Sequence, residues 1–315
     1  MGPQLFVSVA ARSTKPYTAA PVMRWLLGIP FLALLVGPPA DAAPFTFATI
    51  DRPVGIAVTT STLYVTQRCS FQITAFDPTG ASFVFATLPN QGQLCTERYI
   101  ALPTPQFGGD LFATQGRSIF RISGGAATRF VKLPLSAAPN GMGITFDTVG
   151  TWGGDMIVTS HDGQVWRVSA SRSVALVGSV GSQAEGPAVA PLTFSAAPGD
   201  VLVANKVANK VKAIGPDGRV TSVASWTTAE KVDVVPSTPC ALGGGGPAYV
   251  VALPKDDKLI GFRSSDFTGV SGAMVSSETK TTIGNIANNG SVSSFAGPLG
   301  TQGSEALEGS DFCGT

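Results

Sequence analysis

The sequence contains 315 residues, of which 21 are basic and 20 are acidic, so its formal net charge is +1. This balance argues against nucleic acid and anionic membranes as partners, because proteins that bind either are usually strongly basic. Charged residues make up 13% of the chain, whereas there are 37 glycines and 23 prolines. Such a composition favours many short strands joined by tight turns.

The N-terminal segment has the features of a secretory signal peptide. Arg24 precedes an apolar run from Trp25 to Val36, and the small-residue sequence Ala40-Asp41-Ala42 follows. The run is shorter than the ~20 residues that a membrane-spanning helix needs; a short membrane anchor is the alternative. We therefore predict a signal peptide over residues 1–42, with Met23 as an alternative start, and a single domain over residues 43–315. The mature chain would be secreted or periplasmic and would have no membrane span.

A Gly-Asp pair followed by an apolar strand recurs along the chain. The pairs Gly109-Asp110, Gly154-Asp155 and Gly199-Asp200 are separated by 45 residues each. A repeat of this length that contains strands and turns, with no capped helical pattern, is typical of a β-propeller. Each repeat would be a four-stranded antiparallel blade, and the blades would pack around a central channel.

Further copies of the strand determine the number of blades. Similar strands occur at residues 62–66, 248–251 and 272–276, which gives six copies and predicts an all-β, six-bladed propeller. The last two copies are only about 25 residues apart, so one blade is expected to be compressed or distorted, and a five-bladed ring is the alternative. The segment 45–50 resembles the outer strand at 83–88. It is therefore expected to be the outer strand of the last blade, closing the ring against strands from the C-terminus.

The four cysteines are expected to form two disulfides. An even number of cysteines in an exported chain favours disulfide bonds, and four cysteines allow three connectivities. The expected pairing is Cys69 with Cys95, which would join the first blade to the start of the second. Cys240 would then pair with Cys313 and tie the C-terminal end into the ring.

Polar residues stand near the start of each predicted innermost strand. They are Asp51, Glu97, Asn140, Glu185, Glu230 and Glu308. Asn140, Glu185 and Glu230 keep the 45-residue spacing, so the repeat would bring them together around the channel axis. Converging carboxylates and an amide oxygen suit Ca²⁺ or another divalent metal, with Glu185, Asn140, Glu97 and Glu308 as candidate ligands. The alternative is that these residues cap strand ends and hydrogen-bond to neighbouring blades.

The other polar signals are weaker. His161 is the only histidine and lies in a predicted hairpin turn, so we expect an exposed residue in preference to a general base. Lys206, Lys210 and Lys212 surround another turn and are expected to form a solvated edge. The glycine run at 243–246 is expected to be a loop, because a strand follows it, whereas a phosphate-binding loop leads into a helix.

Two tripeptides resemble motifs of a known family. Glu185-Gly186-Pro187 and Pro139-Asn140-Gly141 are similar to motifs of the senescence-marker/gluconolactonase family of six-bladed propellers. In that family the glutamate and the asparagine bind a catalytic divalent metal, so the resemblance implies that Glu185 and Asn140 are ligands. The two motifs occur here in the opposite order, and only Asp233 and Asp311 are candidates for the catalytic aspartate. The segment 52–57 is similar to propellers of the NHL type.

Two functions follow from these observations. The first is an exported, non-catalytic propeller that binds a small-molecule ligand or a protein partner at its channel mouth, with Ca²⁺ as a candidate ion. The alternative is a metal-dependent hydrolase of the gluconolactonase type that acts on lactones or related esters. In that enzyme Glu185 and Asn140 would bind the metal, and Asp233 or Glu230 would be the catalytic base. The fold cannot choose between them, because propellers perform many unrelated functions.

Overall fold

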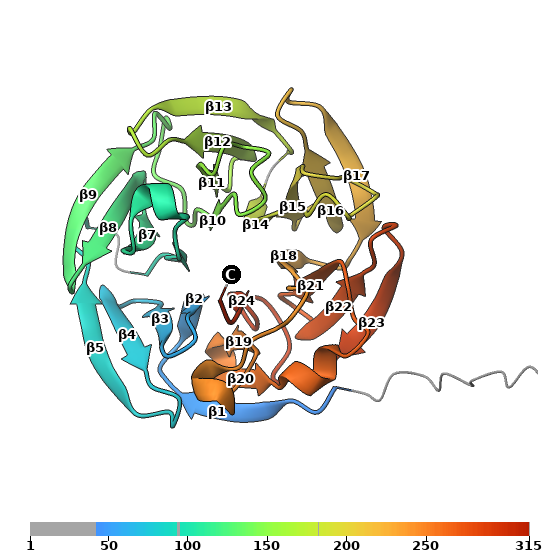
Figure 1. The fold of residues 1–315 in the computed structure, drawn as a ribbon. Helices are drawn as coiled ribbons and strands as arrows, with labels where there is room; N and C mark the ends of the chain where they lie inside the picture. Colours follow the sequence, from blue (N-terminus) through green and yellow to red (C-terminus); the bar gives the residue numbers. More distant parts are fainter. Residues whose placement is uncertain (1–41, 93–94, 182, 315) are drawn as a thin grey trace, which may run out of the picture. The chain divides into compact units, whose positions relative to one another are not determined.

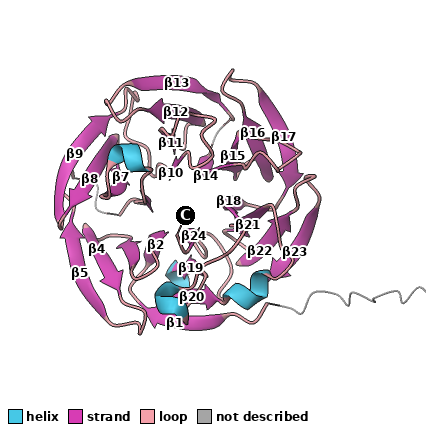
Figure 2. Ribbon diagram, in the orientation of Figure 1, coloured by secondary structure: helices cyan, strands magenta, loops and turns pink. Residues whose placement is uncertain are grey.

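The computed structural model describes residues 42–92, 95–181 and 183–314. The predicted signal peptide lies outside the described residues, apart from Ala42. All described strands belong to the compact unit Ala40–Thr315. Strands dominate, as predicted, and the helical segments among the described residues are four short 3-10 helices (Figure 2). They are η1 (Pro105–Phe107), η2 (Leu242–Gly244), η3 (Pro254–Asp256) and η4 (Ser264–Phe267). No helix in the described part of the chain is long and apolar enough to cross a bilayer.

Three sheets are antiparallel meanders in which each strand pairs with the next one along the chain. The first contains β2 (Pro53–Val58), β3 (Leu63–Gln67), β4 (Gln72–Phe76) and β5 (Ser82–Thr87). The second contains β6 (Ile100–Ala101), β7 (Leu111–Gln115), β8 (Ser118–Ser123) and β9 (Ala126–Lys132). The third contains β10 (Ile144–Phe146), β11 (Met156–Thr159), β12 (Gln164–Val168) and β13 (Val174–Ser179). The sheets lie around a common centre, with β2 and β10 near it and β5, β9 and β13 at the rim (Figure 1).

A fourth sheet has eight strands in two halves. One half contains β14 (Ala184–Val189), β15 (Val201–Asn205), β16 (Lys210–Ile214) and β17 (Val220–Ser225). The other half contains β18 (Ala229–Val234), β21 (Ala273–Ser277), β22 (Thr282–Ile286) and β23 (Val292–Ala296). The halves are joined where Gly186 of β14 pairs in parallel with Lys231 of β18. The all-β, propeller-like arrangement of four-stranded sheets is therefore confirmed, although the sheets are not six separate blades.

The last sheet combines strands from both ends of the described chain. Its order is β1 (Phe45–Thr49), β20 (Lys258–Phe262), β19 (Tyr249–Leu253) and β24 (Ser310–Phe312). The prediction that the N-terminal segment is an outer closing strand is confirmed, since β1 pairs only at one edge, with β20. The disulfide Cys240–Cys313 forms as predicted and joins the residue after β24 to the segment that precedes β19.

The connection between the last two groups of strands explains the short spacing near the C-terminus. After β18 the chain forms β19 and β20 in the closing sheet and then returns to pair β21 with β18. It enters the closing sheet again only with β24. The predicted strands at residues 248–251 and 272–276 therefore belong to different sheets. The short spacing reflects this interleaved connection and not a compressed blade.

The Gly-Asp repeat marks the turn into the second strand of a meander. Gly154 and Gly199 have φ values of 77° and 76°, which glycine adopts far more readily than other residues. The aspartate that follows can reach a basic residue on the third strand. Asp155 Oδ2 lies 2.6 Å from Arg167 Nε on β12, and Asp110 forms the equivalent ion pair with Arg121 on β8. In the repeat, the glycine therefore forms the turn into the second strand, and Asp110 and Asp155 each form an ion pair with the third strand.

A threonine on the second strand connects each of the first three sheets to its neighbour. Thr159 Oγ1 on β11 donates a hydrogen bond of 2.8 Å to the carbonyl of Glu185 in β14. Thr114 on β7 makes the equivalent bond to the carbonyl of Met142, at 2.9 Å, and Thr66 on β3 repeats the pattern. These bonds fix the distance between innermost strands, so Thr159 also positions the backbone of Glu185.

Replacing Thr159 with valine is expected to lower the free energy of unfolding by about 1–3 kcal/mol. Valine has nearly the same shape, but it leaves the buried carbonyl of Glu185 without its hydrogen-bond donor. Urea denaturation would measure the loss. Thr128→Val, on the exposed face of the rim strand β9, is the control and should change the free energy by less than about 0.5 kcal/mol. Equal effects of the two substitutions would contradict this role of Thr159.

Candidate functional site

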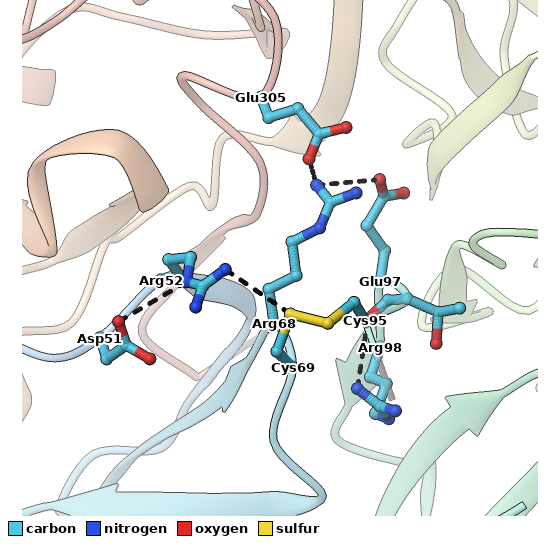
Figure 3. Close-up of a disulfide and its surroundings, with 9 residues drawn as sticks. Asp51, Arg52, Arg68, Cys69, Cys95, Glu97, Arg98 and Glu305 are labelled. Atoms are coloured by element: carbon cyan, nitrogen blue, oxygen red, sulfur yellow. Dashed lines mark hydrogen bonds and ion pairs between the residues drawn. A yellow bond between two sulfur atoms is a disulfide. The ribbon is translucent and has the colours of Figure 1, made fainter. Parts of the chain in front are cut away.

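Four of the predicted glutamates converge at one end of the channel and are buried. Glu97 and Glu308 lie just before β6 and β24, and Glu185 and Glu230 are the second residues of β14 and β18. Each of the four is at most 3% exposed. The side chain of Asp51 does not join them: it is 64% exposed and pairs with the neighbouring Arg52 (Figure 3). We call the four glutamates the carboxylate cluster.

Three cations complete the site: His161 and Lys206, which the sequence interpretation placed outside it, and Arg68, which it did not consider. Arg68, His161 and Lys206 each follow a second strand by one or two residues, and their side chains are 17–18% exposed. The prediction that His161 is an exposed turn residue is wrong, as is the assignment of Lys206 to a solvated edge. His161 and Lys206 are 45 residues apart, and each is seven residues after the glycine of a Gly-Asp pair. The repeat that identified the glutamates could therefore have identified these two cations.

His161 lies between two members of the cluster. Its Nε2 is 3.0 Å from Glu185 Oε2 and 3.3 Å from Glu97 Oε2. Burial alone would lower the pKa of His161, but the contacts with Glu185 and Glu97 outweigh it and raise the pKa to about 10. Burial would raise the pKa of Glu97, yet the contact with His161 and the nearby positive charges lower it. His161 is therefore a cation at neutral pH in the metal-free site.

Lys206 is the counter-charge on the other side of the cluster. Its Nζ lies 3.1 Å from Glu230 Oε2 and 3.0 Å from Oε1 of Glu278, which follows β21. Glu278 is also buried, at 2% exposure. Burial would lower the pKa of Lys206, but the surrounding carboxylates outweigh it and raise that pKa. The ammonium group therefore stays charged and partly neutralises this side of the cluster.

Tyr99 connects Glu230 and Glu308. Its hydroxyl lies 3.0 Å from Glu230 Oε1 and 3.1 Å from Glu308 Oε2. A phenol has one proton, so both contacts are hydrogen bonds only when one of the two carboxyl groups is protonated. Burial, and then the charge of neighbouring glutamates, raises the pKa of Glu230 and of Glu308. Glu230 and Glu308 therefore hold a proton more readily than isolated glutamates do.

The third cation, Arg68, lies next to a disulfide bond that joins its segment to that of Glu97. Cys69 directly follows Arg68, and Cys95 precedes Glu97 by two residues, so the predicted Cys69–Cys95 bond joins the two segments that carry these side chains (Figure 3). Arg68 forms ion pairs with Glu97 and with Glu305. Glu97 Oε1 also accepts a hydrogen bond of 3.0 Å from Asn140 Nδ2. Asn140 therefore lies at the cluster, as predicted, with its amide nitrogen directed at Glu97.

The site contains donor atoms that could bind a metal ion. Ligand atoms of Glu97, His161 and Glu185 lie within 4.8 Å of one another, and Glu97, Glu305 and Glu308 form a second such group. Glu97 Oε2, His161 Nε2 and both carboxylate oxygens of Glu185 are buried and have no partner among the described residues apart from the two ion pairs of His161 Nε2. Buried polar atoms are rarely left in this state, so the first group fits a divalent cation that would replace the proton of His161 between the carboxylates.

The two predicted catalytic candidates, Glu230 and Asp233, lie apart. Both are in β18, but three residues of a strand span about 10 Å. Asp233 Oδ1 is 2.9 Å from Lys231 Nζ, and its Oδ2 accepts hydrogen bonds from Tyr249 and Ser310. Asp233 is therefore not part of the carboxylate cluster. Asp311 also lies elsewhere and accepts a hydrogen bond of 3.0 Å from the backbone nitrogen of Val58.

Comparison with known proteins identifies the fold. No protein-family profile and no curated protein matches the chain. Among solved structures, regucalcin from Agrobacterium tumefaciens, a calcium-binding protein, is similar with a TM-score of 0.53 and 9% identity, over 87% of this chain and 82% of that one. A gluconolactonase from Xanthomonas campestris is similar with a TM-score of 0.53 and 14% identity, over 84% and 82%.

A third similar structure is a lyase. Virginiamycin B lyase from Staphylococcus aureus, solved as an inactive variant with quinupristin, has a TM-score of 0.50 and 18% identity, over 82% of this chain and 75% of that one. Identities this low establish a common fold and nothing about chemistry. The resemblance to a gluconolactonase-like β-propeller is therefore confirmed at the level of the fold.

Proposed function

We propose that the chain is an exported, six-bladed β-propeller that binds a small-molecule ligand or a protein partner at the carboxylate-lined mouth of its channel, where Glu97, His161 and Glu185 hold a divalent cation. The observation that carries the proposal is Glu185. It is fully buried and stands on an innermost strand, and its carboxylate has no partner among the described residues apart from the ion pair of Oε2 with His161 Nε2 at 3.0 Å. Oε1 is left unsatisfied, which is costly unless a ligand or an ion completes it.

The packing of the core supports the count of six blades. Buried apolar side chains form six clusters among the described residues, and each draws on two neighbouring groups of four strands. The two halves of the eight-stranded sheet are themselves separated by one of these clusters, which contains Leu202 and Val275. A single parallel residue pair joins them. On this interpretation each half is a blade.

Two observations support export. Both disulfides of the predicted pairing are present, and such bonds persist in oxidising compartments. The N-terminal sequence has the order of a signal peptide. We therefore assign the mature protein to the periplasm or the extracellular space.

The donor set narrows the choice of metal. Ca²⁺ prefers six to eight oxygen ligands, whereas imidazole nitrogen suits Zn²⁺ and other transition metals. The group of Glu97, His161 and Glu185 therefore favours a transition metal, and the all-oxygen group of Glu97, Glu305 and Glu308 is the better Ca²⁺ site. A bound cation would polarise an oxygen atom of a ligand that enters the mouth. Because the metal must displace the proton of His161, its affinity should increase with pH.

A metal-dependent hydrolase of lactones or esters is the second candidate. Glu230 favours it, because a buried carboxylate with a raised pKa beside a metal group is suited to act as a general base. Asp233 is not retained in this role, since it lies away from the cluster. Turnover of a panel of lactones and aryl esters that disappears in Glu230→Gln and Glu185→Gln would favour the enzyme over the binding protein.

Metal titration of the mature protein tests the proposal. After EDTA treatment, Zn²⁺ or Mn²⁺ is expected to raise the melting temperature and to release about one proton per ion near neutral pH. Calorimetry in buffers with different ionisation enthalpies would measure that proton. Glu185→Gln should abolish both effects, because it removes a ligand of the first group.

Glu305→Gln is the matched control. It changes the second group only, so Zn²⁺ should still bind to this variant. If the dependence were reversed, so that Glu305→Gln abolished binding and Glu185→Gln did not, the ion would occupy the all-oxygen group. If neither Zn²⁺, Mn²⁺ nor Ca²⁺ changed the melting temperature or bound in the calorimeter, the proposed metal centre would be wrong.

A further inference from the structure

The opposite end of the channel contains a cavity that the carboxylate cluster does not use. Its volume is about 510 Å³. All six innermost strands contribute to its lining, namely β2, β6, β10, β14, β18 and β24. The lining continues into the segments that follow these strands, such as Thr148 after β10 and Ser237 after β18. The carboxylate cluster lies at the other ends of the same strands, so the channel has two chemically different mouths.

The inner wall of this cavity is apolar. Ile56, Ile144, Val189 and Val235 line it from four different strands or the segments that follow them. A volume of this size is within the range of sites that hold drug-sized molecules, whose walls are mostly apolar with a few placed polar groups. The wall therefore favours a ligand that buries apolar surface.

Three charged groups line the cavity, and two of them, Lys231 and Asp233, are paired with each other. The third, Asp311, accepts a hydrogen bond of 3.0 Å from the backbone nitrogen of Val58. Lys231 Nζ contacts three oxygen atoms: Asp233 Oδ1 at 2.9 Å, the carbonyl of Val232 at 3.1 Å and that of Pro187 at 3.3 Å. Asp233 Oδ2 accepts hydrogen bonds from Tyr249 and Ser310. Lys231 thus has no proton left to donate to an anion. An anionic ligand would lose its hydration without gaining a counter-charge from Lys231 and would face the carboxylate of Asp311.

Hydroxyl groups line the edge of the cavity. Four of them are exposed to solvent and Thr145 is half-buried, and none makes a side-chain hydrogen bond to another described residue: Thr145, Thr148, Thr193, Ser237 and Ser271. Each can donate one hydrogen bond and accept others. They are suited to the hydroxyl, carbonyl or ether oxygens of a neutral molecule. An adjoining groove of about 660 Å³ shares Leu102, Thr148 and Gly314 with the cavity and would admit a ligand that is longer than the cavity.

We infer that this cavity is a second binding site, for a neutral, largely apolar small molecule that carries hydroxyl or carbonyl oxygens. The apolar wall sets the hydrophobic character of the ligand. The fully paired Lys231 and the carboxylates of Asp233 and Asp311 disfavour an anion, and the hydroxyl groups can bond to the oxygen atoms of the ligand. The site is independent of the metal centre, because no residue of the carboxylate cluster lines it.

Two fluorescent probes that differ by one charge test this inference. N-phenyl-1-naphthylamine is neutral, and 8-anilinonaphthalene-1-sulfonate is the same skeleton with a sulfonate. The mature protein is expected to bind the neutral probe saturably at one site and the sulfonate at least about tenfold more weakly. Thr145→Trp, which would fill the cavity from β10, should lower the affinity for the neutral probe by at least about tenfold.

Control variants keep the result interpretable. Leu176→Trp places the same indole on β13 at the rim of the same sheet, where the side chain is 53% exposed, and should leave binding unchanged. Glu185→Gln should also leave it unchanged, which separates this site from the metal centre. If Thr145→Trp fails to fold by circular dichroism, Thr193→Trp at the exposed edge replaces it. Equal or tighter binding of the sulfonate, or undiminished binding of the neutral probe by a folded cavity-filling variant, would overturn the inference.

Discussion

Replacing Lys206 with methionine is expected to lower the free energy of unfolding by about 3–5 kcal/mol at neutral pH. Lys206 Nζ lies within 3.1 Å of Glu230 and Glu278, and both carboxylates are at most 2% exposed. Methionine fills a similar volume but leaves two buried negative charges without their counter-charge. Chemical denaturation at pH 7 would measure the loss. It should exceed the effect of Thr159→Val, because a buried unpaired charge costs more than a buried unpaired carbonyl.

Two comparisons distinguish this effect from a general loss of packing. Lys210→Met changes an exposed lysine at the other end of the same hairpin and should alter the free energy by less than about 0.5 kcal/mol. Adding Glu230→Gln to Lys206→Met should restore a large part of the loss, since a neutral amide needs no counter-charge. The loss should also shrink at lower pH, where Glu230, whose pKa burial already raises, becomes protonated. A loss below about 1 kcal/mol at pH 7 would show that these ion pairs contribute little.

The local pattern of the sequence was enough to predict the arrangement of strands, but not every connection between them. The structure of a Gly-Asp turn and the apolar strand after it depends on neighbouring residues alone, because the glycine conformation and the contact from Asp155 to Arg167 lie within one repeat. No sequence feature near β18 or β21 indicates that two strands of another sheet lie between them in the chain. Whether β19 continues the sheet of β18 or begins the next one depends on packing between residues far apart in the chain, and strand sequences of both sheets look alike.

The sequence predicted the site residues that follow the repeat at the start of innermost strands. It missed the cations in turns, because a turn residue is usually exposed and the sequence does not show which turns are buried. Glu185 and Glu230 follow the 45-residue register at the start of innermost strands, so their convergence could be predicted. His161 follows a register too, but a polar residue in a turn was interpreted as exposed. It is largely but not fully buried, because the ring brings that turn to the axis. Asp233 was a candidate only through the family resemblance, which carries no information on its position in this chain: three residues along β18 separate it from Glu230 and place it away from the cluster.

The stability of the metal-free protein is expected to fall as the pH rises from about 6.5 to 10, and His161 should account for much of the fall. The folded pKa of His161 is about 10, against an ordinary value of 6.5. Below pH 6.5 both states bind the proton, and the ion pairs with Glu97 and Glu185 contribute fully. Above it the unfolded chain releases the proton first, so the contribution, on the order of 3–5 kcal/mol, is progressively lost.

The variant His161→Gln isolates this contribution. Glu230 and Glu308 also have raised pKa values and destabilise the folded protein as they ionise, so the wild-type slope contains their effect as well. Glutamine keeps a polar side chain between the carboxylates but cannot titrate, so the difference between the two profiles belongs to His161. Since the chain contains a single histidine, one imidazole proton signal in an NMR titration reports its pKa directly. A midpoint near 6.5, or parallel stability profiles for wild type and variant, would mean that Glu97 and Glu185 do not hold a charged imidazole between them.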